Sequence, residues 1–141
     1  MTDALIRRAE HADLAAMVHL RREWTREQDG DIADPDFDEN LAAWFARESS
    51  RRIMWLAEER GRAVGMMNLA IYERMPRPGR ALSRWGYLGN VFVLAAYRNR
   101  GIGSQFVSAA LKYADENGFV RVVLGVPVTI EPSAPLPRPV S

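Results

Sequence analysis

A strand that ends in a glycine-containing turn and is followed at once by a helix is the feature that most constrains this chain. The run reads Val91-Phe92-Val93-Leu94-Ala95-Ala96-Tyr97-Arg98-Asn99-Arg100-Gly101-Ile102-Gly103-Ser104. Gly101 and Gly103 lack a Cβ, so the backbone there can approach a ligand closely. The first amides of the helix have no acceptor within it, and the helix dipole adds partial positive charge at the same end. The turn therefore predicts a pyrophosphate site, to which Arg98 and Arg100 add charge.

Two better known phosphate-binding motifs are absent from the sequence. It contains no Gly-x-x-x-x-Gly-Lys-Ser/Thr segment, and its glycines do not follow Gly-x-Gly-x-x-Gly. Nucleotide hydrolysis and dinucleotide binding are therefore disfavoured. A turn without any ligand stays open as the alternative, because a tight strand-to-helix connection can use two glycines for conformational reasons alone.

The spacing Arg98-x-x-Gly101-x-Gly103 after a β-branched strand resembles the acyl-CoA-binding signature of the GNAT superfamily of N-acetyltransferases. The resemblance implies an α/β fold with a mixed, mostly antiparallel sheet flanked by helices, and acetyl-CoA as co-substrate without a metal. The pyrophosphate would lie on the amides of the turn, and the pantetheine arm would pair with the strand, where an N–H near Val93 polarises the thioester carbonyl. The residues implied to bind acetyl-CoA are Val91, Phe92, Val93, Arg98, Asn99, Arg100, Gly101, Ile102, Gly103 and Ser104.

The periodicity of the remaining sequence predicts elements in the order of that fold. We expect strands over residues 4–9, 53–59, 63–72, 85–94 and 120–126, helices over residues 13–28 and 101–117, and a further helix that carries Leu41, Trp44 and Phe45. The last strand is expected to be buried and parallel to the strand before the last helix. A chain of 141 residues is long enough for one domain with its own core.

The composition narrows the chemistry further. A formal net charge of +1 gives no reason to expect nucleic-acid binding, and the lack of cysteine excludes disulfides, thiolate metal sites and a cysteine nucleophile. His11 and His19 are the two histidines, and no third ligand stands at metal spacing, so no metal site is predicted. No apolar run is long enough for a membrane span or a secretion signal, which predicts a cytoplasmic protein.

The sequence names no clear catalytic base. Some proteins of the similar family place a catalytic glutamate where this chain has Tyr87, Asn90 could position a water, and Glu73 is another candidate base. For Tyr87 and Asn90, strand packing and a bulge are the alternative roles. Trp24, Trp44, Trp55 and Trp85 are expected to pack in the core rather than to form a substrate cage.

Two charged segments flank these candidates. The acidic segment 29–39 is expected as a loop that borders an acceptor cleft and attracts a cationic amine, with a solvated loop as the alternative. The basic segment 74–84 would cover the cleft or steer the phosphates of CoA, unless it is simply a solvated loop.

The chain departs from the family after Val126. We divide it into a GNAT-like domain over residues 1–126 and a tail over residues 127–141, which holds five of the eight prolines and is unsuited to a helix. Similar proteins continue with a helix, often with a tyrosine that protonates the departing thiolate, and a final strand. The tail is either a Pro-rich segment or the product of a frameshift, because a shift of one base lets the codons for Ser133 to Arg138 spell Val-Pro-Leu-Tyr-Arg. A missing last strand would leave an edge that favours a homodimer.

The expected function is transfer of an acetyl group from acetyl-CoA to a primary amine of a small molecule or protein. Such an amine has a pKa of about 10.4 in water, so its proton must leave before the attack. Two alternatives stay open. The chain could be a catalytically weak or inactive acyl-CoA-binding module, or an interaction domain with no affinity for CoA.

Overall fold

The structure is a computed structural model that describes residues 4–125. The Pro-rich tail and the frameshift hypothesis lie outside these residues. Along the chain the elements are β1 (Leu5–Arg8), the short helix η1 (His11–Asp13), α1 (Leu14–Asp29), α2 (Phe37–Glu48), β2 (Arg52–Glu59), β3 (Arg62–Glu73), β4 (Arg84–Val93), the short helix η2 (Ala95–Tyr97), α3 (Ile102–Glu116) and β5 (Val122–Leu124).

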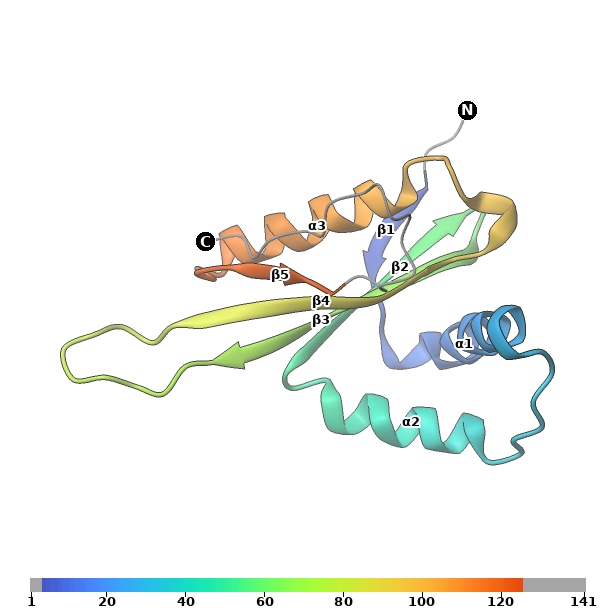
Figure 1. The fold of residues 1–141 in the computed structure, drawn as a ribbon, viewed down its shortest axis with the longest axis horizontal. Coiled ribbons are helices and arrows are strands. Elements are labelled where there is room, and N and C mark those ends of the chain that lie inside the picture. The colour runs from blue at the N-terminus through green and yellow to red at the C-terminus, as the bar shows by residue number, and fades with distance from the viewer. Residues whose placement is uncertain (1–3, 126–141) are drawn as a thin grey trace.

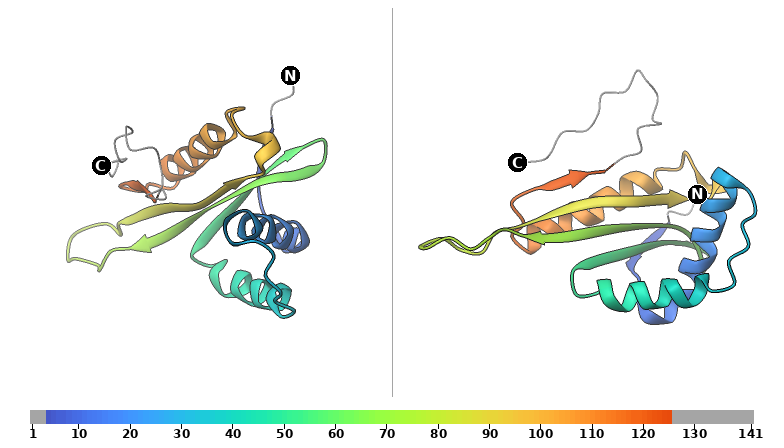
Figure 2. Two further views of the ribbon diagram at one scale, coloured as in Figure 1. Left: turned by 45° about the vertical axis from the view of Figure 1, so that its right-hand side comes forward. Right: turned by 60° about the horizontal axis from the view of Figure 1, so that its bottom comes forward.

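The strands form one sheet in the order β1-β2-β3-β4-β5. Neighbours are antiparallel except for β4 and β5, which are parallel. Helix α3 covers one face of this sheet, and α1 and α2 lie on the other (Figures 1 and 2). The mixed, mostly antiparallel sheet flanked by helices is thus confirmed, as is the parallel pairing of the last strand.

Helix α3 is held to the sheet by a stripe of apolar side chains at four-residue spacing. Ile102, Phe106, Ala110 and Ala114 are buried against a core that includes Leu69 of β3. A spacing of four places these side chains on one face of a helix. Gly103 and Ser104, between the buried positions, consequently face outward.

A second apolar cluster joins α1 to the opposite face of the sheet. Met17 and Leu20 of α1 pack with Met54, Leu56, Met66 and Phe92 from three strands. Trp24 stacks on Phe92, with ring centroids 5.4 Å apart and planes 9° from parallel. This contact ties α1 to the C-terminal end of β4.

Several boundaries differ from those expected. The last strand spans only Val122–Leu124, and Val120 is 44% exposed, so the prediction of a buried strand from residue 120 is wrong. The end of the acidic segment, from Phe37 onward, belongs to α2 rather than to a loop.

Gly118 follows the C-terminal end of α3 and lies in the left-handed region, with φ at 68°.

The four tryptophans divide between the core and the surface. Trp55 is 5% exposed and lies in the core under α3, as predicted. Trp85 instead stacks on Tyr72, with centroids 4.6 Å apart, at the base of the β3–β4 hairpin. Trp24 and Trp44 are half-buried and line a cavity, so core packing does not fully describe them.

The connection between β3 and β4 extends away from the rest of the fold (Figure 1). It carries the basic segment and lies at the end of β4 opposite to the start of α3. The basic segment is therefore far from the glycine turn, and the structure gives no support to the role of steering phosphates to it. No helix within residues 4–125 has the length and apolar character needed to cross a membrane.

Gly86 of β4 provides a test of how tightly the core between the sheet and α3 is packed. A Cβ at this position would lie 2.6 Å from Leu69 Cδ1 and 3.3 Å from Phe119 Cε2. We expect Gly86→Ala to lower the free energy of unfolding by about 1–3 kcal/mol through overpacking, measured by urea denaturation. Combining it with Leu69→Ala should remove most of this cost. An equal cost in both backgrounds would contradict the explanation.

An ion-pair network between β1, η1 and β2 predicts a pH dependence of stability. The Arg7 guanidinium bonds Asp13 at 2.6 Å and Glu58 at 2.7 Å, and the bond to Arg7 holds the pKa of Asp13 below its ordinary value. The stabilisation is therefore complete above the unfolded pKa of about 3.9 and is lost as the pH falls through the folded pKa.

We expect Asp13→Asn to lower the stability at pH 7 by about 1–3 kcal/mol and to flatten the decline in acid. The measurement is the unfolding free energy between pH 7 and pH 3. Asp115→Asn, which removes an exposed carboxylate from α3, is the matched control. A decline as steep as that of the unsubstituted protein would contradict the assignment.

Candidate active site

Strand β4 contains one extra residue near its C-terminal end. Asn68 of β3 pairs with Gly89, whereas Met66 pairs with Phe92, so β4 uses three steps where β3 uses two. Asn90 lies in this bulge with φ at 51°, in the left-handed region that asparagine tolerates better than most residues. The extra residue reverses which backbone groups of β4 face each neighbour.

Before the bulge, the even-numbered residues of β4 turn their backbone groups toward β5. Gly86 N donates to Arg121 O at 3.0 Å, and Leu88 O accepts from Gly125 N at 2.7 Å. Pairing between β4 and β5 ends at Leu88. The stretch from Gly89 to Val93 therefore has β3 on one side and no second neighbouring strand within residues 4–125.

After the bulge, the even-numbered residues turn toward β3, as Leu94 N shows by donating to Val64 O at 2.9 Å. By the alternation of strand geometry, Val91 and Val93 then point their N–H and C=O groups to the open edge. Arg98 confirms the direction, since its Nε donates to Val93 O at 2.9 Å. The result is a strand edge that a ligand with amide groups can pair with.

The turn between this edge and α3 presents a group of amides. Asn99 and Gly101 both have positive φ, at 63° and 83°. The first main-chain bond to close α3 runs from Gln105 N to Gly101 O at 3.0 Å. The amides from Asn99 to Ser104 donate to no acceptor in the described part of the chain. A Cβ at Gly103 would meet no atom within 4 Å, so the space above the helix terminus is open.

Both arginines of the turn have acidic partners. Arg98 Nη2 lies 2.7 Å from Glu27 Oε2 of α1 and lowers the pKa of that carboxyl, and Arg100 Nη1 lies 3.3 Å from Glu59 Oε1 of β2. Each arginine therefore already has a carboxylate partner in the protein, and both guanidiniums stay exposed. The amides of the turn and the dipole of α3 favour an anion at the same place.

The structure limits how some of the predicted acetyl-CoA residues could act. The side chains of Phe92 and Ile102 are buried, at 5% and 3% exposed, so neither can touch a ligand without a rearrangement. The backbone of Phe92 faces β3, and Ile102 has only its amide at the turn. Val91, 38% exposed, and the outward-facing residues of the turn are accessible. The acetyl-CoA contacts themselves stay a prediction.

A cavity of about 340 Å³ lies between α1, α2 and the sheet and reaches the bulge. Its lining combines aromatic, apolar, amide and guanidinium side chains: Met17, Arg21, Trp24, Phe37, Leu41, Trp44, Arg52, Met54, Met66, Asn68 and Asn90. None of the lining residues carries a carboxylate or an imidazole. The described residues also hold no cluster of three or more histidine and acidic side chains suited to a metal.

A chain of hydrogen bonds crosses the base of this cavity. Arg52 Nη1 donates to Asn68 Oδ1, and Asn68 Nδ2 donates to Asn90 Oδ1, each at 2.9 Å. A guanidinium can only donate, so it fixes the orientation of both amides. Asn90 is left with its Nδ2 donors free of any partner among residues 4–125 and near the open edge.

Glu48 anchors this chain at its other end. The carboxylate is 8% exposed and accepts from Arg51 at 2.7 Å and from Arg52 at 2.9 Å. These two bonds, that of Arg51 being the larger effect, lower the pKa of Glu48. Glu48 is thus held in its charged form, and it acts as a partner for Arg52 rather than as a base.

The three catalytic candidates lie in different places. Asn90 lies at the cavity. Tyr87 lies before the bulge and is 42% exposed, and its hydroxyl lies against Gly125 at the end of β5. Glu73 pairs with Arg84 at the base of the hairpin, five positions along β3 from the Asn68 level, and so stands apart from the cavity.

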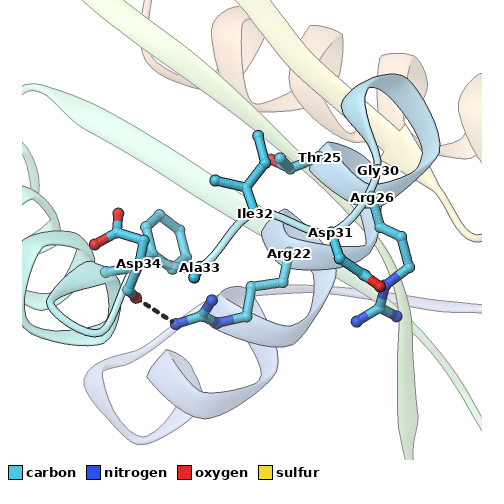
Figure 3. A pocket seen from close by; sticks show the side chains of 9 residues that line it. Arg22, Thr25, Arg26, Gly30, Asp31, Ile32, Ala33 and Asp34 are labelled. Atoms are coloured by element: carbon cyan, nitrogen blue, oxygen red, sulfur yellow. Dashed lines mark hydrogen bonds and ion pairs between the residues drawn. The ribbon is translucent and has the colours of Figure 1, made fainter.

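The acidic segment borders a second cavity, of about 430 Å³, beside the connection between α1 and α2 (Figure 3). Arg22 donates to Asp34 O at 3.1 Å and to Asp38 at 2.9 Å, and Arg26 bonds Asp31 at 2.7 Å. Two of the acidic side chains, those of Asp31 and Asp38, are therefore paired with arginines of α1. The expected attraction of a cationic amine by this loop has no support from these contacts.

Sequence reasoning missed Arg21, Arg52 and Asn68. The signal for Asn68 was present, because a lone amide within the apolar run from Val64 to Ile71 must find a buried partner. Nothing comparable marked the two arginines, which resemble the other arginines of α1 and of the strand ends.

Comparisons with known proteins agree with the fold. A model of the acetyltransferase (GNAT) family matches residues 14–136. No curated protein matches the chain.

Solved structures share the fold at low sequence identity. A predicted acetyltransferase from Clostridium acetobutylicum, solved with acetyl-CoA, is 21% identical with a TM-score of 0.70, over 92% of this chain and 84% of that one. Glucosamine-6-phosphate N-acetyltransferase from Arabidopsis thaliana is 18% identical with a TM-score of 0.69, over 90% and 84%. An aminoglycoside acetyltransferase from an uncultured soil metagenomic sample, in complex with sisomicin, is 19% identical with a TM-score of 0.72, over 89% and 78%.

The family match spans most of the chain and includes the glycine turn, the open strand edge and strands β2 to β5. The chain therefore belongs to the acetyltransferase (GNAT) family and is an acyltransferase.

Proposed function

We propose that this chain transfers an acetyl group from acetyl-CoA to a primary amine held in the cavity between α1, α2 and the sheet. The observation that carries the proposal is the open edge of β4 beyond Leu88, which begins beside the cavity at Asn90 and ends at the free amides of the turn. A donor laid along this edge would bring its acyl end to the cavity.

The donor would use the backbone more than the side chains. The pyrophosphate would accept hydrogen bonds from the turn amides up to Ser104, and the amides of the pantetheine arm would pair with Val91 and Val93. An N–H of the same edge on the Asn90 side of these contacts would then polarise the thioester carbonyl, because the acyl end lies toward the cavity. Arg98 takes up Val93 O, which leaves the N–H of this residue as the group available at the edge.

In the reaction the neutral amine attacks the thioester carbonyl carbon, the C–S bond breaks, and CoA leaves as a thiolate. The amine loses a proton and the thiolate gains one. The described lining of the cavity offers no carboxylate or imidazole to accept the first proton. A water molecule that accepts a hydrogen bond from Asn90 Nδ2 keeps a second lone pair, which would accept the proton of the amine. Bulk water would then carry this proton away.

The lack of a carboxylate or imidazole in this lining favours one alternative function, that of an acyl-CoA-binding protein. A protein that binds acyl-CoA through the edge and the turn but lacks an efficient base would be a weak catalyst. Release of CoA thiol with a panel of primary amines separates the two functions. Turnover above the hydrolysis rate supports the enzyme, whereas tight acetyl-CoA binding without turnover supports the binding module.

Gly103→Val tests the donor site. The new side chain meets open space in the free protein, so the fold should stay intact, but it blocks the close approach of a pyrophosphate to the turn. We expect isothermal titration to show acetyl-CoA affinity reduced by at least about 100-fold, roughly 2.7 kcal/mol. Ser108→Val places the same side chain on an exposed position of α3 and should bind normally. Equal affinity of both variants would rule out the turn as the donor site.

Asn90 tests the bulge. Glycine tolerates its left-handed backbone, whereas alanine at φ 51° costs roughly 1 kcal/mol. We expect Asn90→Gly to keep acetyl-CoA affinity within about threefold, and Asn90→Ala to have the lower thermal midpoint and the weaker binding. If the water on Asn90 serves the amine proton, turnover falls in both variants. Full turnover in Asn90→Gly would exclude that role.

A further inference from the structure

We infer that the acceptor amine carries a carboxylate that Arg21 receives, on a molecule with an apolar body of the size of an aromatic or branched amino acid. The inference rests on the proposed function, because it names the substrate class of the same cavity. It is carried by the charge and the shape of the lining rather than by the donor site.

Arg21 is a guanidinium without an acidic partner. It is half-buried in α1, and burial lowers its pKa, yet it makes no hydrogen bond or ion pair within residues 4–125. Its neighbour Arg22 on the same helix does have one, in Asp38. A charge that is partly removed from water and left unpaired is costly. An anionic ligand in the cavity would satisfy it.

The guanidinium is held in a defined position. Its Cζ lies 4.3 Å from the centroid of the Trp24 ring, and Trp24 is itself stacked on Phe92. A planar guanidinium that rests on a fixed ring keeps its N–H edge free for a two-pronged bond to a carboxylate. The stack of Arg21, Trp24 and Phe92 thereby provides a preorganised binding site for a carboxylate.

Arg52, the other cation of the cavity, already has hydrogen-bond partners within the protein. Its Nε bonds Glu48 and its Nη1 bonds Asn68, and its Cζ lies 5.3 Å from the Trp44 ring. Its charge is thus largely neutralised by a carboxylate outside the lining. The net positive charge available to a ligand is that of Arg21.

The rest of the lining suits an apolar body. Trp24, Phe37, Leu41 and Trp44 face the cavity with Met17, Met54 and Met66. A volume of about 340 Å³ is at the small end of ligand pockets, which range from about 300 to 1,000 Å³. A molecule with several ammonium groups would meet two guanidiniums and no carboxylate here. An amino acid with a large apolar side chain matches the charge, the polarity and the size.

Matched pairs of acceptors test this. Phenylalanine with phenethylamine, tryptophan with tryptamine, and leucine with 3-methylbutylamine differ within each pair in the carboxylate alone. We expect kcat/KM, measured by thiol release with acetyl-CoA, to be at least about tenfold higher for the amino acid in one or more pairs, after correction for the fraction of neutral amine. Equal or higher values for all three amines without a carboxylate would overturn the inference, with the proposed function intact.

Variants assign the preference to Arg21. Arg21→Met keeps an apolar stem on Trp24 but removes the charge, and we expect it to lower the ratio of kcat/KM within the preferred pair by about 10- to 100-fold. Arg47→Met removes an exposed arginine of α2 outside the cavity lining and should keep the ratio. A ratio that survives Arg21→Met would overturn the assignment.

A binding measurement separates this inference from the proposed function. The acetylated amino acids, such as N-acetylphenylalanine, can be titrated into the protein without any donor. Binding that Arg21→Met weakens by about tenfold or more supports the carboxylate site even if no amine is turned over, in which case the proposed transfer alone fails. Binding that is absent, or equal in both proteins, overturns the inference.

Discussion

One extra residue in β4 sets the geometry on which the rest of the site depends. Up to Leu88 the strand is an ordinary member of the sheet, with β3 on one side and β5 on the other. The bulge at Asn90 then exchanges the two edges, so that backbone groups that would have faced β5 face β3 instead. The groups of Val91 and Val93 are left on an edge without a strand. The edge is open because pairing with β5 ends at Leu88, and the bulge decides which residues present their backbone groups there.

A chain of hydrogen bonds that begins at the Glu48–Arg52 ion pair determines which side-chain atoms donate and which accept at the site. Glu48 holds Arg52, Arg52 holds the oxygen of Asn68, and Asn68 holds the oxygen of Asn90. Since each amide has one accepting end, the order of donors and acceptors is fixed from one end of the chain to the other. At the bulge, the cavity is therefore lined by hydrogen-bond donors, which are the free Nδ2 hydrogens of Asn90. Together with Arg21, this makes the cavity a place for oxygen-rich, anionic groups, in contrast to the acidic loop that the sequence suggested.

The sequence was sufficient for the fold and for locating the glycine turn between β4 and α3, whereas the acetyl-CoA contacts stay a prediction. The glycine turn, the stripe from Ile102 to Ala114 and the β-branched strands each depend on neighbours within one or two elements, which periodicity records. The acceptor half depends on side chains from α1, α2 and three strands. Nothing in the local pattern of Arg21 distinguishes it from Arg22, because the difference lies in which residues the fold brings next to each. The bulge at Asn90 was likewise only an alternative until the register was known.

Two long-range contacts tie the glycine turn and the start of α3 to distant parts of the chain. Gln105 Nε2 at the start of α3 donates to Ala4 O at 3.1 Å, across 101 positions of the chain, and Arg98 bonds Glu27 across 71. Contacts of such sequence separation require large loops to close, at an entropic cost that grows with loop length. The geometry of the turn amides is therefore tied to Ala4, just before β1, and to Glu27 of α1, both far from the turn in sequence.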